Sequence, residues 1–183
     1  MIYRFTFISD EADHFLREIQ INSDATFLDL HKAILESTGY PDDQMTSFFT
    51  CNENWEKETE ITLEDMGSSS DVDNYVMSET AIDELVEDEK QRLLYVFDPL
   101  AERVFFIELS EIIPGKSLPK AVCTRKEGTA PRQTLDFDQL MSLEPASSLD
   151  LDDSFGDDEN IDLDELDEEG MGFLDEISND DIL

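Results

Sequence analysis

The sequence predicts an α+β fold: a mixed β-sheet with helices on one face, a β-grasp-like start and an acidic C-terminal tail. Two observations lead to this prediction. Strand-like and helix-like apolar patterns follow one another in the order hairpin, helix, strand and second hairpin. The basic residues then stop at Arg132, and every charged residue beyond it is acidic. We therefore expect an α+β domain over residues 1–143 and a partly disordered or docking tail over residues 144–183.

The first elements are predicted as a hairpin. Residues 2–9 and 14–22 are rich in β-branched and aromatic residues and are separated by the polar stretch DEAD. A third strand is expected over residues 45–51, where apolar residues return.

A helix is predicted between the hairpin and the third strand. Thr26, with Asp29 three residues later, forms a capping box. The apolar residues that follow fall on one helical face, and Gly39 followed by Pro41 ends the helix.

The middle of the domain is less regular. Residues 52–76 are polar, and no element is assigned to them. Thr80 with Asp83 reads as a second capping box, which predicts a short helix through about Lys90.

A second hairpin is predicted from residues 92–97 and 103–109, two apolar runs across a short turn. Residues 114–132 hold three of the six prolines, so they are expected to form an irregular loop. A last short helix is expected over residues 135–143.

Charge limits the classes of partner. The chain has 12 Lys and Arg against 47 Asp and Glu, a net charge of −35. Such a surface repels nucleic acid and anionic membranes, which bind through Lys and Arg. We expect a basic protein partner, with nucleic-acid mimicry as a special case, and no direct nucleic-acid or membrane binding. The alternative is that the charge only keeps the protein soluble.

Localisation is predicted from the apolar patterning. The sequence has no run of 18 apolar residues, and its start, MIYRFTFISDEAD, lacks the pattern of a signal peptide. The expected location is therefore cytoplasmic.

The tail combines acidic and apolar residues. Residues 133–183 contain 19 acidic residues and no basic one, with apolar residues interleaved among them. This composition is typical of disordered segments that fold into a basic, apolar groove. The alternative is that the tail docks on its own domain. The residues expected to bind a partner are Trp55, which lies in a polar loop, and the tail residues Phe155, Leu166, Phe173 and Leu174.

Three stretches carry a resemblance to a known family. They are IYRFTFIS with FLREIQINSDATFLDLHKAILESTGY, then LLYVFDPLAERVFFIEL, and finally LPKAVCTRKEGTAP. Over residues 2–132 they resemble the plasmid pRiA ORF-three-like family, a prokaryotic group often labelled as transposon passenger proteins. The resemblance implies an α+β domain akin to a β-grasp, and it implies no established activity.

The chain departs from the family pattern at two places. After YVFD the family continues Phe-Gly-Asp-Asp-Trp, whereas this chain has PLAER. The later Pro-Pro-Glu-Asp of the family becomes Pro131, Arg132 and Gln133. A pocket lined by those acids in relatives would have lost its charges here.

A second class of function uses a ligand pocket. The turn from Asp98 to Arg103 and the loop from Cys123 to Pro131 could enclose it, and Arg103, Arg125 and Lys126 would favour an anionic ligand of a binder or an enzyme. A third possibility is a structural subunit with a solubilising tail.

Catalytic and metal motifs are not found in the sequence. None of the seven glycines forms a phosphate-binding loop, and no nucleophile elbow is present. His14 and His31 lack partners at metal-ligand spacing. The acids between Glu165 and Glu176 match a calcium loop only loosely. We therefore expect a non-enzymatic protein with no catalytic residue, cofactor or metal.

Overall fold

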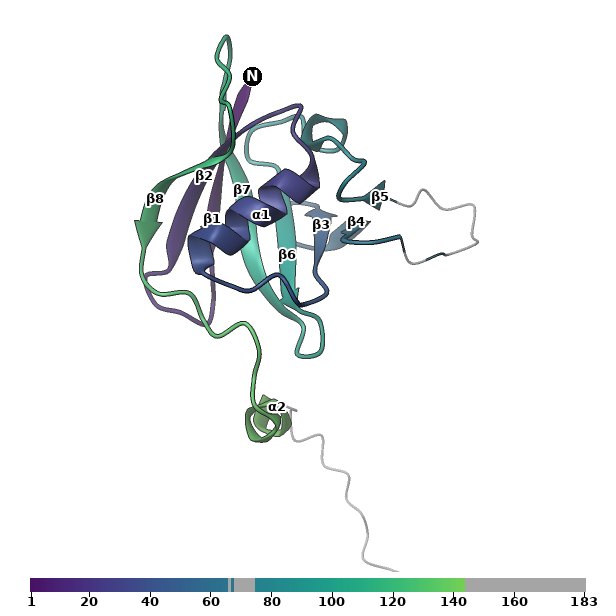
Figure 1. Cartoon of the computed structure of the whole chain (residues 1–183), viewed down its shortest axis with the longest axis vertical. Coiled ribbons are helices and arrows are strands. Elements are labelled where there is room, and N and C mark those ends of the chain that lie inside the picture. Colours follow the sequence, from purple (N-terminus) through teal and green to yellow (C-terminus); the bar gives the residue numbers. More distant parts are fainter. Residues whose placement is uncertain (66, 68–74, 144–183) are drawn as a thin grey trace, which may run out of the picture. The chain divides into compact units, whose positions relative to one another are not determined.

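A computed structural model describes residues 1–65, 67 and 75–143 (Figure 1). The described chain forms one eight-stranded sheet in the order β5-β4-β3-β6-β7-β1-β2-β8. Every neighbouring pair is antiparallel except β4 and β5, which run parallel, so the sheet is mixed. The predicted α+β class is confirmed, with the sheet as the dominant part. In chain order the elements are β1 (Ile2–Ile8), β2 (Leu16–Asn22), α1 (Phe27–Thr38), β3 (Ser47–Cys51), β4 (Lys57–Thr62), β5 (Tyr75–Val76), the 3-10 helix η1 (Ile82–Glu84), β6 (Arg92–Asp98), β7 (Arg103–Ile113), β8 (Val122–Glu127) and α2 (Phe137–Leu143).

The core lies on one face of the sheet and follows the two-residue period of its strands. Phe5 of β1 is opposite Ile19 of β2 on one side and Leu109 of β7 on the other. All three side chains are fully buried, as is Tyr95 of β6, opposite Phe105 of β7. The intervening residues of β1, β2 and β7 point to the opposite face and are less buried.

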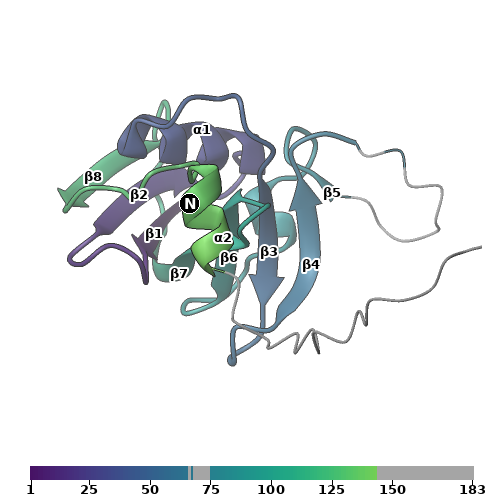
Figure 2. The same ribbon diagram turned by 90° about the horizontal axis from the view of Figure 1, so that it is seen from below.

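Helix α1 covers this core face (Figures 1 and 2). Its start is the predicted capping box: the Thr26 hydroxyl accepts from the Asp29 amide, and the Asp29 carboxylate accepts from the Thr26 amide. Gly39 ends the helix in the left-handed conformation, with φ of 79°. Phe27 is fully buried and packs on Phe48 of β3, with ring centroids 5.3 Å apart.

Two predictions for the middle of the domain were wrong or incomplete. The helix expected from Thr80 to Lys90 is a single 3-10 turn, because the Thr80 hydroxyl donates to Val76 O and does not cap a helix. Lys90 then adopts a φ of 70° and leads into β6. The polar stretch 52–76 contains β4 and β5, which lie at one edge of the sheet.

The irregular loop expected over residues 114–132 was also wrong in part. It contains β8, a six-residue strand that forms the other edge of the sheet. All six of its residues are exposed, so their sequence lacks the apolar alternation by which half-buried strands are identified.

None of the helices in the described part of the chain has the length and apolar character needed to cross a membrane.

Candidate functional site

The candidate site is a pocket of about 570 Å³ at one end of the sheet. Three segments line it: the β1–β2 turn, the β6–β7 turn with the start of β7, and the segment around α2. The lining residues are Asp10, Glu11, Ala101, Glu102, Arg103, Val104, Leu135, Gln139 and Ser142. Hairpin turns at the same end of the sheet bring Glu11 and Arg103, which are 92 residues apart in the chain, to one place.

Arg103 is the buried cation of this pocket, and its guanidinium has several polar partners. Its guanidinium forms a two-pronged contact with Glu11, in which Nε lies 2.8 Å from Oε1 and Nη2 lies 2.7 Å from Oε2. Nη1 donates to Asp98 Oδ2 and to the Gln133 carbonyl oxygen, both at 3.3 Å. The Phe97 ring centroid lies 4.8 Å from the guanidinium carbon. The side chains of Arg103 and Asp98 are 5% and 8% exposed, and that of Glu11 is 34% exposed.

The charge of this pocket favours a cation. Burial alone would lower the pKa of Arg103, but the hydrogen bonds and negative charges of Glu11 and Asp98 outweigh it and raise that pKa. The guanidinium is therefore permanently charged and already neutralised by two carboxylates. Asp10 and Glu102 remain in the lining as exposed acids. An anionic ligand would meet an excess of negative charge here.

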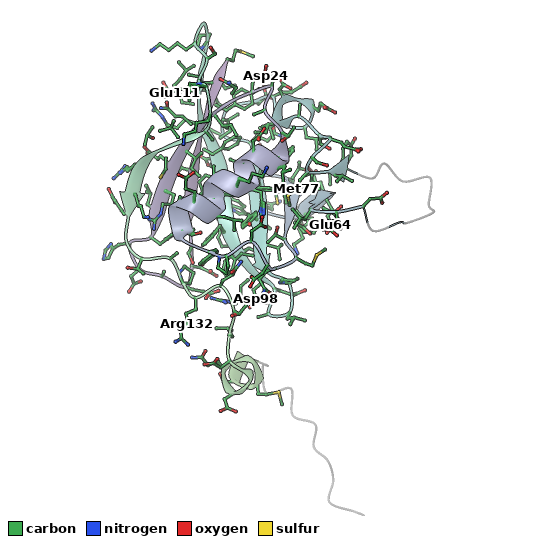
Figure 3. The ribbon with its side chains drawn as sticks, in the orientation of Figure 1. Asp24, Glu64, Met77, Asp98, Glu111 and Arg132 are labelled. Atoms are coloured by element: carbon green, nitrogen blue, oxygen red, sulfur yellow. The ribbon has the colours of Figure 1, made fainter. Side chains whose placement is uncertain are left out.

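The segment that leads into α2 is fastened to the domain at this pocket. The Tyr40 hydroxyl donates to the Pro131 carbonyl oxygen, and Gln133 Nε2 donates to the Pro41 carbonyl oxygen at 3.3 Å. The main-chain carbonyl oxygen of Gln133 accepts a hydrogen bond from Arg103. Figure 3 shows Asp98 and Arg132 at the end of the domain where the chain continues to α2.

The residues of the predicted ligand pocket are only partly brought together. Asp98 and Arg103 form a buried ion pair with Nη1 and Oδ2 3.3 Å apart. Cys123, Arg125 and Lys126 lie on the exposed strand β8 and do not line the pocket beside the 98–103 turn. The loop expected between Cys123 and Pro131 is a strand over most of its length because its backbone pairs with β2.

Trp55 lies in the turn between β3 and β4 with a φ of 66°. Its ring packs edge-on against Phe106 of β7, with centroids 5.0 Å apart, and the Arg92 guanidinium lies 4.9 Å from its centroid. The side chain is half-buried on the face of the sheet away from α1. This packing accounts for Trp55 without a partner, and its role as an anchor stays a prediction. The other predicted anchors, Phe155, Leu166, Phe173 and Leu174, lie outside the described residues.

His31 belongs to a buried network between α1 and the sheet. Its Nδ1 is 2.8 Å from the Tyr95 hydroxyl and its Nε2 is 3.3 Å from Asp42 Oδ1. Burial lowers the pKa of His31, against the hydrogen bond and charge of Asp42, which raise it. The imidazole is 1% exposed, so it holds the helix on the sheet and cannot contact a ligand in this arrangement.

Metal ligands do not gather in the part of the chain that the structure covers. No group of three or more His, Cys, Asp or Glu side chains there is arranged to hold an ion. The calcium-loop match between Glu165 and Glu176 falls outside the described residues.

The polar lining residues that the sequence analysis did not assign to a pocket are Asp10, Glu11, Gln139 and Ser142, whereas Glu102 belongs to the turn from Asp98 to Arg103 that it did assign. The stretch DEAD was interpreted only as a turn. Both predicted hairpins have acidic residues in their turns. Two hairpin turns at the same end of a sheet can lie side by side, and this pattern could have indicated that the acids of the two turns form one site.

Comparison with known proteins identifies a family and a fold. The model of a family described as plasmid pRiA4b ORF-3-like protein matches residues 6–141. A crystal structure of a protein of unknown function, MM3350 from Methanosarcina mazei Go1, is similar with a TM-score of 0.55 at 20% sequence identity, over 68% of each chain. At this identity the similarity concerns the fold alone. No curated protein matches the chain.

Proposed function

Given that this chain belongs to the plasmid pRiA4b ORF-3-like family, as its sequence motifs predicted, we propose that it is a non-enzymatic interaction module for a basic protein. The folded domain presents the acidic pocket at the end of the sheet, and residues 144–183, which follow α2 in the sequence, form the acidic tail. The observation that carries the proposal is this pocket, in which the Arg103 cation is neutralised by Glu11 and Asp98 while Asp10 and Glu102 stay exposed.

The pocket suits a Lys or Arg side chain of the partner. Its mouth offers carboxylates for charge-assisted hydrogen bonds. Its wall includes the apolar side chains of Val104 and Leu135, against which the methylene stem of a Lys or Arg can pack.

The tail supplies the second part of the mechanism. Residues 144–183 carry 17 acidic residues and no basic one, so they attract a basic surface and speed encounter. Phe155, Leu166, Phe173 and Leu174 then insert into an apolar groove of the partner. Burial of each is worth roughly 1.5–3 kcal/mol before the cost of ordering the tail.

Two peptides of equal charge test this mechanism. One is a labelled Lys/Leu amphipathic peptide, and the other is a Lys/Gly peptide without an apolar face. By fluorescence anisotropy, the full chain should bind the Lys/Leu peptide at least tenfold more tightly, with affinity falling steeply as salt rises. Replacing the four apolar tail residues by Ala should remove that preference. Equal binding of both peptides would show that the charge acts alone and would contradict the mechanism.

The contribution of the pocket is tested by charge reversal. The variant D10K/E102K should weaken binding of the Lys/Leu peptide. The control E64K/E79K makes the same change in net charge at exposed positions that do not line the pocket. If both variants lose the same affinity, the pocket has no special part in binding.

A further inference from the structure

The sheet carries a second apolar surface on the side away from α1, which we call the outer face. Five apolar residues, one each from β2, β1, β7, β6 and β3, are directly opposite one another in the order Leu16, Ile8, Phe106, Leu94 and Phe49. Residues directly opposite in paired strands point to the same side of a sheet. The five side chains therefore form one continuous row across five neighbouring strands.

The β3 end of this row is covered by the protein's own side chains. Trp55 packs edge-on against Phe106, and the Lys57 ammonium lies 4.5 Å from the centroid of the Phe49 ring. Leu94, between those two rings in the row, is 5% exposed.

The row is open at the end formed by β1 and β2. Ile8 is 47% exposed, and Leu16 is half-buried. Figure 2 shows α1 on the other side of these strands, and α2 lines the pocket at the end of the sheet. An exposed apolar surface with polar residues around it is typical of a protein–protein contact.

The outer face is nearly neutral in a strongly acidic domain. Residues 1–143 contain 30 Asp and Glu against 12 Lys and Arg. On the five strands of the row, register places three carboxylates and two cations on the outer face: Glu18, Glu108, Glu111, Arg4 and Arg92. Arg4 forms an ion pair with Glu111, and Arg92 is directly opposite Glu108. These five strands therefore give the outer face a net charge of −1.

This charge favours a second copy of the chain as the occupant. Two copies, each with a net charge of −35, repel one another wherever their acidic surfaces meet, and the repulsion is least at a nearly neutral face. A basic partner gains no electrostatic advantage here, because most carboxylates of this face already have a cation beside them. An apolar centre with few charges is also the usual composition of homodimer interfaces.

The outer face is large enough for a dimer. Five strands about 4.8 Å apart, with about six residues each at roughly 3.3 Å per residue, give a footprint of about 24 Å by 20 Å. Two such faces bury about 1,000 Å², which is the lower limit for a specific interface.

We infer that the outer face is the interface of a homodimer, in which the outer faces of two copies pack on one another as two layers. In such packing the strands of the two sheets are nearly aligned, and the layers lie about 10 Å apart. The same surface serves both copies, so Ile8 and Leu16 of each copy contact the apolar row of the other.

Sedimentation equilibrium of the purified full chain tests this inference without any other partner, so its outcome is independent of the proposed function. The average mass should rise from 20.9 kDa toward twice that value between roughly 1 and 200 µM, as expected for an interface near the lower size limit. Raising the salt concentration to about 0.5 M should strengthen the association at least threefold, because salt screens the repulsion between the copies. Binding of a basic peptide has the opposite dependence on salt.

Substitutions in the row locate the interface. Ile8→Glu should raise the dissociation constant of the dimer at least tenfold, because it places a charge in the apolar row of both copies. The control Met45→Glu makes the same change in charge at a residue outside the row that is 44% exposed, and it should leave association nearly unchanged. Leu16→Glu is a second variant of the row, so the result does not depend on the folding of one variant, which circular dichroism checks.

Three results would overturn the inference. The first is a monomeric mass over the whole concentration range at about 0.5 M salt. The second is equal weakening by I8E and M45E, which would assign the effect to net charge. The third is unchanged association of folded I8E and folded L16E, which would assign the contact to another surface.

Discussion

The buried ion pair at the candidate pocket gives the most specific prediction of stability. We consider Arg103→Met, which replaces the guanidinium with an apolar side chain of similar length. The substitution leaves Asp98, 8% exposed, without its cation. Glu11 is 34% exposed and can turn toward water, so its carboxylate is not left buried.

The size of the effect follows from this asymmetry. Removing one partner of a buried pair costs roughly 3–5 kcal/mol because a charge is left without compensation. Asp98 keeps a second donor, the Ala101 amide at 3.3 Å, and only one carboxylate is stranded. We therefore expect the lower end, about 3 kcal/mol, which corresponds to a fall of roughly 10 °C in Tm for a domain of this size.

Urea unfolding followed by circular dichroism measures this loss. The control is Arg132→Met, which breaks an exposed pair with Asp136 at 3.4 Å and should leave the midpoint unchanged. The double variant R103M/D98N should recover part of the loss because the stranded charge is removed. An R103M midpoint equal to that of the unchanged protein would refute the account of this site.

Three further predictions concern His31, Gly128 and Cys51. Burial lowers the pKa of His31 below its usual 6.5, so below about pH 6.5 the unfolded chain binds a proton at His31 more readily than the folded chain does. The free energy of unfolding should therefore fall as the pH drops below about 6.5. Urea midpoints that stay constant between pH 7 and pH 5 would contradict this. Gly128→Ala should destabilise the protein by more than about 1 kcal/mol, because the residue has a φ of 64° and an added Cβ would lie 2.6 Å from the His14 carbonyl oxygen. An unchanged Tm in thermal unfolding of the variant would show that this strain is absent. Burial raises the pKa of Cys51 to about 11, so iodoacetamide at pH 8 should modify the exposed Cys123 before Cys51. Mass spectrometry of the folded protein measures the two rates of modification. Equal rates at the two cysteines would mean that Cys51 is accessible.

The elements that could be predicted from the sequence are those in which the pattern of apolar residues reflects which side chains are buried. The hairpin β1–β2, helix α1 and the strands β3, β6 and β7 bury one face or both, so their apolar residues recur with the period of the element. Thr26 and Gly39 fixed the ends of α1 because capping is local. The edge strands β5 and β8, and β4 next to β5, were missed because an exposed strand contributes backbone pairing and few buried side chains.

The candidate pocket was harder to predict than the fold. Asp98 and Arg103 were chosen from the β6–β7 turn and do form an ion pair. Their partner Glu11 is 92 residues away from Arg103, and its place depends on the order of strands in the sheet. Strand order is a property of the whole fold. Arg125 and Lys126 were grouped with Arg103 around a pocket between a turn and a loop, and the structure instead places them on the exposed strand β8.

The position of Trp55 gives the protein a built-in optical probe. It is the single tryptophan in the chain, and its indole touches Phe106 and lies under Arg92 on the face of the sheet away from α1. Trp55 is not among the residues that line the acidic pocket, and it does not belong to β8. Its emission should therefore respond to unfolding of the sheet while staying silent to a ligand at either place. A spectral change on adding a partner would locate that partner at the β3–β4 turn.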